Sequence, residues 1–149
     1  MSSHYEGAPD EVLALNTFVK LARCLNAIQS EMFPALQKEF GITESQFGVL
    51  EALHHLGPLS QGQICEKILR SGSNVTTVVD NLERDKLVRR VRDEVDRRVQ
   101  IVHITPEGEA LIGKCFPVHV ARVTKRIGVL SRDEQRELGR LCKKLGTEG

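Results

Sequence analysis

The chain has 149 residues, a length that fits one domain of ordinary size. With 40% hydrophobic and 28% charged residues, its composition is that of a folded globular protein and excludes an intrinsically disordered chain. The formal net charge is only +1, so total charge does not indicate a nucleic-acid partner, and no apolar run approaches the roughly 18 residues of a membrane-spanning helix.

The first predicted element is a long helix over residues 11–40. Its apolar residues recur at the spacing of one helix face: Val12, Leu15, Val19, Ala22, Leu25, Ile28, Met32 and Leu36. Leu13, Phe18 and Leu21 make this face wider than one neighbouring element requires. Pro34 is expected to kink or split the helix because proline removes a backbone hydrogen bond. The wide apolar face indicates contact with a partner chain.

Two shorter helices are predicted next, each with its own start signal. The sequence TESQ at residues 43–46 fits a capping box, and this helix runs to about His55, before Gly57 and Pro58. The sequence SQGQ at residues 60–63 repeats the capping pattern and begins a helix over residues 61–69.

A third helix is predicted over residues 73–84, after the glycine at position 72. Its apolar face consists of Val75, Val78, Val79 and Leu82. The opposite face carries small hydroxyl and amide side chains. A short helix, a turn that contains glycine and a second helix are the layout of a helix-turn-helix. Such a polar face suits the major groove of DNA, which admits one helix.

Two strands and a charged turn follow. Residues 87–91 and 99–104 are rich in β-branched residues and predict a hairpin, with DEVDRR at its tip. Because two strands alone are marginally stable, Leu59 is expected to supply a minimal third strand. Residues 84–98 hold seven basic and four acidic side chains, a local charge of +3. A local basic stripe is typical of a surface that faces phosphates.

Two more helices complete the predicted domain. Thr105 and Pro106 fit the N-cap and first position of a helix that Pro117 is expected to bend. The sequence SRDE at residues 131–134 is a further capping box, and the helix that it opens is expected to bury Leu138, Leu141, Cys142 and Leu145. The fold class is mainly α (α+β). Residues 1–149 are predicted to form a single domain, with a winged helix-turn-helix lobe over residues 43–104.

The order of these elements and several sequence stretches resemble the MarR family of bacterial transcriptional regulators. The stretches are GITESQFGVLEAL, LSQGQICEKI, SNVTTVVDNLERDKLVRR, DRRVQIVHITPEGEAL and LSRDEQRELGRLCKKL. The most specific feature is the D-x-R of the wing, residues 96–98, followed by a strand and T-x-x-G at residues 105–108. EKILRSGSNVTTVVDNLE and KCFPVHV are similar to the MhqR-like subgroup, which is linked to stress from quinones and phenolic compounds.

The resemblance covers residues 13–145 and implies a homodimeric, ligand-responsive repressor with no catalytic activity and no cofactor. The helices at residues 11–40 and 106–146 would form the dimer base. Each recognition helix, residues 73–86, would enter a major groove of a pseudo-palindromic site. Arg98 at the wing tip would reach a minor groove, oriented by Asp96. Whether Arg97 also touches DNA or faces water is open.

The candidate DNA-binding residues lie on the recognition helix and the hairpin: Ser73, Asn74, Thr76, Thr77, Asn81, Arg84, Arg90, Asp96, Arg97 and Arg98. Asn74, Thr76 and Thr77 are the expected base readers, whereas Ser73, Asn81 and Arg84 are expected to touch phosphates. Asp80 would repel phosphate, so we expect it to accept a hydrogen bond from a base or to pair with a nearby arginine. One of Arg89, Arg90 and Arg92 is expected to contact phosphate, and Gln61 and Gln63 are candidates for further backbone contacts.

The resemblance also implies an effector pocket between the dimer base and the DNA-binding lobe. Its candidate lining residues are Met32, Phe47, Leu50, His54 and Phe116. The expected effector is a small phenolic, quinone-like or other aromatic molecule.

Three alternatives remain open from the sequence. A thiol-based redox sensor would use Cys24, whereas Cys65 and Cys142 are expected to be inert core residues. A metal sensor would need more ligands than His54 and His55, since neither C-x-x-C nor H-x-x-x-H occurs, and no metal site is predicted. A winged helix used only for protein–protein contact is the third.

The cysteine pattern and the absence of a signal peptide predict a reduced, cytosolic chain with no membrane partner. The absence of a P-loop, G-x-S-x-G, G-x-G-x-x-G and H-x-E motif argues against an enzyme.

Overall fold

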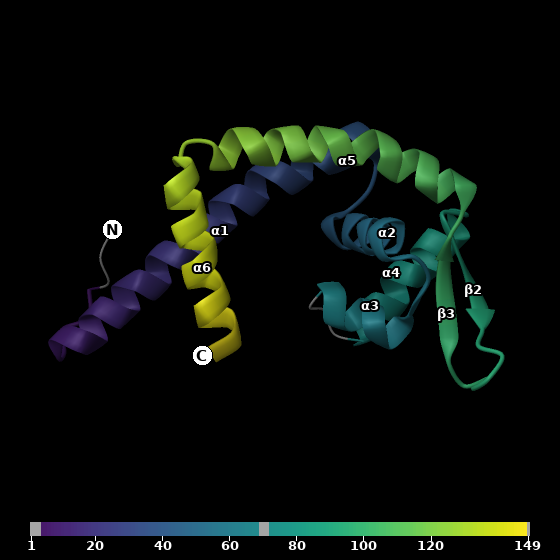
Figure 1. The fold of residues 1–149 in the computed structure, drawn as a ribbon, viewed down its shortest axis with the longest axis horizontal. Coiled ribbons are helices and arrows are strands. Elements are labelled where there is room, and N and C mark those ends of the chain that lie inside the picture. Colours follow the sequence, from purple (N-terminus) through teal and green to yellow (C-terminus); the bar gives the residue numbers. More distant parts are fainter. Residues whose placement is uncertain (1–3, 69–71, 149) are drawn as a thin grey trace. The chain divides into compact units, whose positions relative to one another are not determined.

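The computed structural model describes residues 4–68 and 72–148, which form the helices and the small sheet labelled in Figure 1. In chain order the elements are α1 (Pro9–Phe40), α2 (Glu44–Leu56), β1 (Leu59–Ser60), α3 (Gln61–Ile68), α4 (Gly72–Arg84), β2 (Val88–Arg92), β3 (Gln100–Ile104), α5 (Pro106–Ile127) and α6 (Arg132–Glu148). The mainly α winged-helix order predicted from the sequence is confirmed. The chain divides into two compact units, one ending at Thr43 and the other beginning at Glu44.

The first unit is dominated by α1. The helix begins at Pro9, and the Glu11 carboxylate accepts the backbone N–H of Ala8 at 3.1 Å, which satisfies one of the N–H groups at the helix start. It ends at Gly41, whose φ of +71° places it in the left-handed region that favours glycine. Pro34 lies inside this helix, which runs on to Phe40. The alternative that Pro34 splits the helix is therefore wrong.

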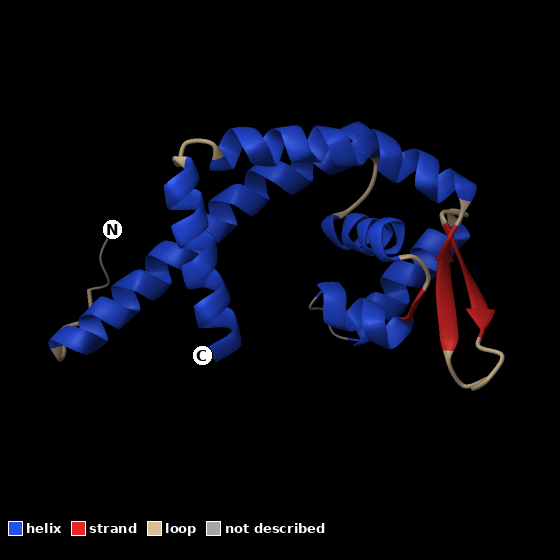
Figure 2. Ribbon diagram, in the orientation of Figure 1, coloured by secondary structure: helices blue, strands red, loops and turns tan. Residues whose placement is uncertain are grey.

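The second unit contains a three-stranded antiparallel sheet of order β1–β3–β2, shown in Figure 2. Val102 of β3 lies between Leu59 of β1 and Arg90 of β2, so the third strand predicted at Leu59 is confirmed. Helices α2 to α5 and the sheet share one apolar core, whose fully buried members include Leu50, Leu53, Ile64, Val75, Val79, Leu82 and Val102. Three of these are the predicted apolar face of α4, so its polar face is left outward.

The start of the hairpin is fixed by contacts around Leu87. The backbone N–H of Leu87 donates to the Leu82 carbonyl at 2.9 Å, and the Leu87 carbonyl accepts the N–H of Thr105 at 3.0 Å. The Thr105 hydroxyl donates to the Lys86 carbonyl at 2.7 Å and accepts the N–H of Gly108 at 3.1 Å, so it is also the N-cap of α5, as predicted. One residue thus joins the end of β3 to the start of β2 and to α5.

The last helix carries an apolar face that the described chain leaves exposed. Ser131 and Glu134 form the predicted capping box, with backbone-to-side-chain distances of 2.7 and 3.2 Å. The leucines of α6 are not buried as expected: Leu138, Leu141 and Leu145 are exposed, and so is Cys142. The prediction of burial is therefore wrong for the single chain.

Among the described residues, none of the helices is both long enough and apolar enough to cross a membrane. The same residues contain no group of three or more His, Cys, Asp or Glu side chains that could hold a metal ion.

Candidate nucleic-acid interface

The outward face of α4 presents short polar side chains to solvent. Asn74, Thr76 and Thr77 are exposed near its start, and Arg84 is exposed at its end. Asn81 is half-buried on the same helix. The side chain of Ser73 lies outside what the structure describes. A helix with small donors and acceptors near its N-terminus lets the backbone approach base edges and phosphates closely.

Thr76 is held in place from the neighbouring helix. The Gln61 amide Nε2, at the first position of α3, donates to the Thr76 hydroxyl at 2.5 Å. Gln63 is occupied differently: its side chain accepts the Ser60 N–H at 2.9 Å, and its own N–H donates to the Ser60 hydroxyl at 3.2 Å. This is the predicted capping box, so Gln63 serves the start of α3.

Arg90 does not present its guanidinium to solvent as a phosphate contact would. Its side chain is only 14% exposed, and its Nη2 lies 2.6 Å from Asp80 Oδ1. Its Nη1 lies 3.3 Å from Glu83 Oε1, and its backbone N–H donates to Glu83 Oε2 at 2.8 Å. Arg90 is therefore not a candidate DNA contact, because its guanidinium is already paired with two carboxylates. Of the two alternatives for Asp80, the structure shows the arginine pair.

Strand alternation in the sequence predicts that Arg90 and Arg92 share a face, but the buried neighbour Val88 was not used to identify that face as the inner one. Side chains two apart lie on one face of a strand, so Arg90 follows Val88, which is buried, onto the inner face. Arg89 and Arg92 are exposed and remain candidates for phosphate contact.

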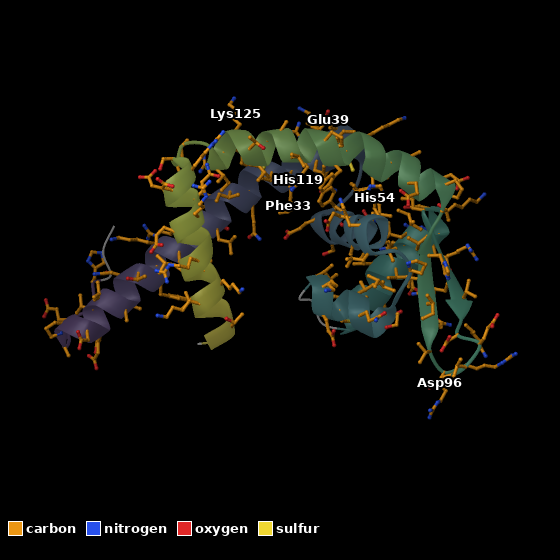
Figure 3. The ribbon with its side chains drawn as sticks, in the orientation of Figure 1. Phe33, Glu39, His54, Asp96, His119 and Lys125 are labelled. Atoms are coloured by element: carbon orange, nitrogen blue, oxygen red, sulfur yellow. The ribbon has the colours of Figure 1, made fainter. Side chains whose placement is uncertain are left out.

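The hairpin ends in a charged wing tip, residues 93–98, which Figure 3 marks at Asp96. The turn is closed by the Asp93 N–H, which donates to the Val99 carbonyl at 2.9 Å, and by the Val99 N–H, which donates to the Asp96 carbonyl at 3.0 Å. Arg98 donates from Nε to Asp96 Oδ1 at 3.1 Å and from Nη2 to Asp96 Oδ2 at 3.3 Å. The predicted bracing of Arg98 by Asp96 is thus present.

The braced arginine is also the most accessible member of the pair. The Arg98 side chain is 91% exposed. Its hydrogen bonds to Asp96 lower the pKa of that carboxyl below the ordinary value of an aspartate, so Asp96 stays ionised over a wider range of pH. The two-pronged contact fixes the guanidinium without covering it. Arg97 beside it is exposed as well.

Two of the residues predicted for an effector pocket, Phe47 and Phe116, are in contact in the second unit. Phe47 of α2 and Phe116 of α5 stack at 6.3 Å between ring centroids, with His119 at 4.7 Å from Phe47. His55 adds a ring at 4.8 Å from Phe116. We call these four rings the α2–α5 ring cluster. Phe47 and Phe116 were predicted; the two histidines were missed, although His119 lies one helical turn from Phe116 in the sequence.

Of the other three pocket candidates, His54 lies beside the cluster, with its ring centroid 4.9 Å from that of His55. Leu50 is fully buried in the second unit, and Met32 is buried on α1 in the first. His54 sits at the end of α2, where its Nδ1 lies 2.5 Å from Glu109 Oε2 of α5. Figure 3 shows His54 and His119 at separate places along the helices. His119 is half-buried, and desolvation, followed by the charge of Arg122, lowers its pKa below 6.5 in spite of the opposing charge of Glu51.

Two of the four cysteines, Cys65 and Cys142, are more exposed than the sequence predicts. Cys24 and Cys142 are exposed, Cys65 is half-buried and Cys115 is buried. Burial raises the pKa of the Cys115 thiol, which makes it unreactive. The expectation that Cys65 and Cys142 are core residues is therefore wrong. Cys24 has the exposure that a sensing thiol requires.

Comparison with known proteins agrees with this geometry. Residues 40–99, which include the helix-turn-helix and most of the hairpin, match the profile of the MarR family. The HTH-type transcriptional regulator MhqR of Bacillus subtilis is 35% identical over 133 residues, which are 89% of this chain and 91% of that protein. Both are regulators of transcription and not enzymes.

Solved structures show the same fold. The MarR family regulator Sco3205 from Streptomyces coelicolor, in complex with DNA, has a TM-score of 0.85 at 20% identity and covers 97% of this chain and 91% of its own. Bordetella bronchiseptica BpsR, whose DNA binding is regulated by 6-hydroxynicotinic acid, has a TM-score of 0.75 at 25% identity. That match covers 87% of this chain and 98% of BpsR.

Proposed function

Because this chain belongs to the MarR family of DNA-binding transcriptional regulators, we propose that it is a homodimeric repressor which a small aromatic effector releases from its operator. It acts in the cytoplasm, where the DNA is. Its recognition helix and wing occupy adjacent grooves of the same site, so the bound protein excludes other proteins from that DNA.

The observation that carries the DNA-binding mode is the braced Arg98 at the wing tip. An arginine held by a carboxylate, yet 91% exposed, is oriented toward something outside the chain. The narrow minor groove has a strong negative potential that attracts inserted arginine side chains. We therefore assign Arg98 to the minor groove, with Arg97 near the adjacent phosphates.

On α4, the exposed Asn74 and Thr77 are our proposed base readers, together with Thr76 in the position that Gln61 gives it. Ser73, Asn81 and Arg84 flank them as proposed phosphate contacts. Amide and hydroxyl side chains can pair with the donor and acceptor pattern of the major groove.

The homodimer is supported by apolar faces that nothing in the described chain covers. Leu13, Phe18 and Leu25 of α1 are exposed, and so are Leu138, Leu141 and Leu145 of α6. A second copy of the chain, related to the first by a two-fold axis, would cover these residues. The resulting dimer would present two recognition helices to a pseudo-palindromic operator. The half-sites would lie about one helical turn, roughly 10 base pairs, apart.

The α2–α5 ring cluster supports an aromatic effector, because aromatic molecules stack on phenylalanine and histidine rings at such distances. BpsR responds to an aromatic acid, 6-hydroxynicotinic acid, which fits this class. We propose a phenolic, quinone-like or other aromatic effector. To release the operator it must bind the DNA-incompetent form more tightly, typically by about 1–3 kcal/mol.

A thiol sensor on the same scaffold is the second candidate, favoured by the exposure of Cys24. In this case an oxidant releases DNA from the parent protein, and Cys24→Ser abolishes the response.

Fluorescence anisotropy on the DNA that flanks the gene of this protein tests the proposal. We expect tight binding whose log affinity falls steeply with log salt concentration, and release by a phenol or quinone in a variant that lacks Cys24. Release by oxidants alone would favour the thiol sensor. A nearly salt-independent affinity would contradict binding through phosphates.

A further inference from the structure

Arg90 joins the wing to the recognition helix through a set of contacts that neither DNA contact nor core packing explains. Every acceptor that its guanidinium reaches belongs to α4: the Asp80 and Glu83 carboxylates and, at 3.4 Å, the Thr76 carbonyl. Asp80 and Glu83 are three residues apart and therefore lie on one side of the helix. The fork of the guanidinium thus spans about one turn of α4 from a single position on β2.

The backbone of β2 takes part in the same link. β2 is an edge strand, because the sheet order is β1–β3–β2, and Arg90 pairs with Val102 of β3. The N–H of Arg90 donates at 2.8 Å to Glu83 Oε2 of α4 rather than to a third strand. Glu83 therefore binds both the main chain and the side chain of Arg90. The two contacts fix the position and the direction of the strand against the helix.

The Arg90 side chain is 14% exposed, whereas those of Asp80 and Glu83 are 59% and 42% exposed, so the ion pair is only partly buried. Such a pair is weak evidence for stability, because desolvating the guanidinium offsets much of the attraction. An apolar residue at the same inner strand position, like Val88 before it, would fill the core without that desolvation. The best-attested benefit of a buried ion pair is geometric specificity. The contacts of Arg90 fit a role in geometric specificity, because its partners on α4 fix the position of β2 at more than one point along the helix.

We propose that Arg90 is a positioning residue that sets the register between the wing and the recognition helix, so that Arg98 and the α4 side chains reach adjacent grooves of one site together. This inference rests on the proposed DNA-binding mode. Arg90 touches no DNA in it. It acts through Arg98 on the wing and through Thr76 on α4. Gln61 donates to the Thr76 hydroxyl, and Arg90 donates to the Thr76 carbonyl.

The matched variants are Arg90→Lys and Arg89→Lys. Both keep the charge of β2, but lysine cannot bond to two carboxylates in the planar, forked geometry of arginine. Arg89 is exposed on the other face of the same strand, so in the distance measurement, which contains no DNA, it controls for the loss of a guanidinium as such. Thermal melting of both variants checks that they are folded.

The first readout needs no DNA. Nitroxide labels at Val95→Cys on the wing and Asn74→Cys on α4, both exposed positions, report the wing-to-helix distance by pulsed electron paramagnetic resonance. The accessible Cys24, Cys65 and Cys142 are replaced by Ser in this background. We expect a broader or shifted distance distribution for Arg90→Lys and the parent distribution for Arg89→Lys. An unchanged distribution in Arg90→Lys would overturn the proposal, whether or not the chain binds DNA.

The second readout is a double-mutant cycle on operator DNA with unlabelled protein. Arg90→Lys is expected to lower the ratio of specific to non-specific affinity by about fivefold or more, and to add little when Arg98 is already Ala, since interacting residues are not additive. Additive losses would overturn the positioning role. If the parent protein binds no specific DNA, the proposed function fails, while the distance measurement still decides whether Arg90 positions the wing.

Discussion

At the scale of single residues, Arg98 shows how a long flexible side chain is prepared for binding. A free arginine loses rotamer entropy when it enters a groove, and Asp96 reduces that loss by holding Nε and Nη2 beforehand. Asp96 itself must remain charged, which its lowered pKa ensures. Asp96, which holds the arginine, and Arg98, which is proposed to enter the groove, are thus separate residues with separate chemistry.

Replacing Arg98 with Ala is expected to weaken specific binding by about tenfold or more and to reduce the salt slope of log affinity by about two, one for each subunit of the dimer. Asp96→Asn should cause a smaller loss, because the arginine remains but is no longer held by a charge. Arg136→Ala is the control, because it removes the same charge from an exposed arginine on the polar side of α6. The Arg136 side chain pairs with Asp133 at 2.9 Å. Equal binding by Arg98→Ala and the parent would remove Arg98 from the interface.

His119 makes the stability of the second unit depend on pH. Its pKa is lowered in the fold, so the unfolded chain, with the ordinary value of 6.5, binds a proton more readily. By linkage, the stability from this residue is fully present above pH 6.5 and is lost as the pH falls through the lowered folded value. Urea unfolding at several values of pH should show the loss, and His119→Gln should flatten it. His4→Gln, at an exposed histidine, serves as the control; an equal slope in parent and His119→Gln would refute the assignment.

At the scale of elements, the contact of α5 with the start of β2 determines where the hairpin begins. A Cβ built at Gly108 would collide with the Leu87 carbonyl and approach the Ile104 side chain, so this backbone crossing needs a glycine. The capping hydroxyl of Thr105 lies one residue before the helix and bonds to both sides of the junction.

Gly108→Ala is therefore expected to lower the free energy of unfolding by about 1–3 kcal/mol through overpacking. Gly113→Ala on the same helix meets nothing within 4 Å and should be neutral or stabilising by up to about 1 kcal/mol, because alanine is the better helix former. Chemical denaturation of both variants measures the difference. Equal stabilities would show that the backbone at Gly108 relaxes without cost.

The sequence predicts these elements well where a local rule governs them. Capping boxes mark the starts of α3 and α6, and the helical spacing of Val75, Val79 and Leu82 predicts the buried face of α4. It fails where a residue depends on a distant partner. Alternation puts Arg90 on the same face as Val88, but its ion pairs depend on Asp80 and Glu83 of α4, which the local pattern does not place. The ring cluster likewise depends on how α2 packs on α5.

At the scale of the whole molecule, α1 and α6 each carry exposed apolar side chains, among them Phe18 of α1 and Leu141 of α6. The prediction that the α6 leucines are buried was wrong for the single chain, because periodicity identifies an apolar face but not the chain that covers it. Each leucine side chain that a second copy covers fully contributes about 1.5–3 kcal/mol to association.

Leu141→Glu is accordingly expected to convert a dimer into a monomer, which analytical ultracentrifugation at micromolar concentration measures. Leu56→Glu is the matched control, since Leu56 is an exposed leucine at the end of α2 and outside both faces. A parent protein that sediments as a monomer, or a Leu141→Glu variant that remains a dimer, would contradict the role proposed for α6.

The central claim is that two copies of α4 and the wing read one operator, and a hydroxyl-radical footprint on the DNA flanking the gene tests it most directly. We expect two protected segments, related by symmetry, with centres about 10–10.5 base pairs apart. Outside each segment we expect a protected minor groove that Arg98→Ala loses while the central protection remains. A single protected segment, or flanking protection that survives Arg98→Ala, would contradict the account.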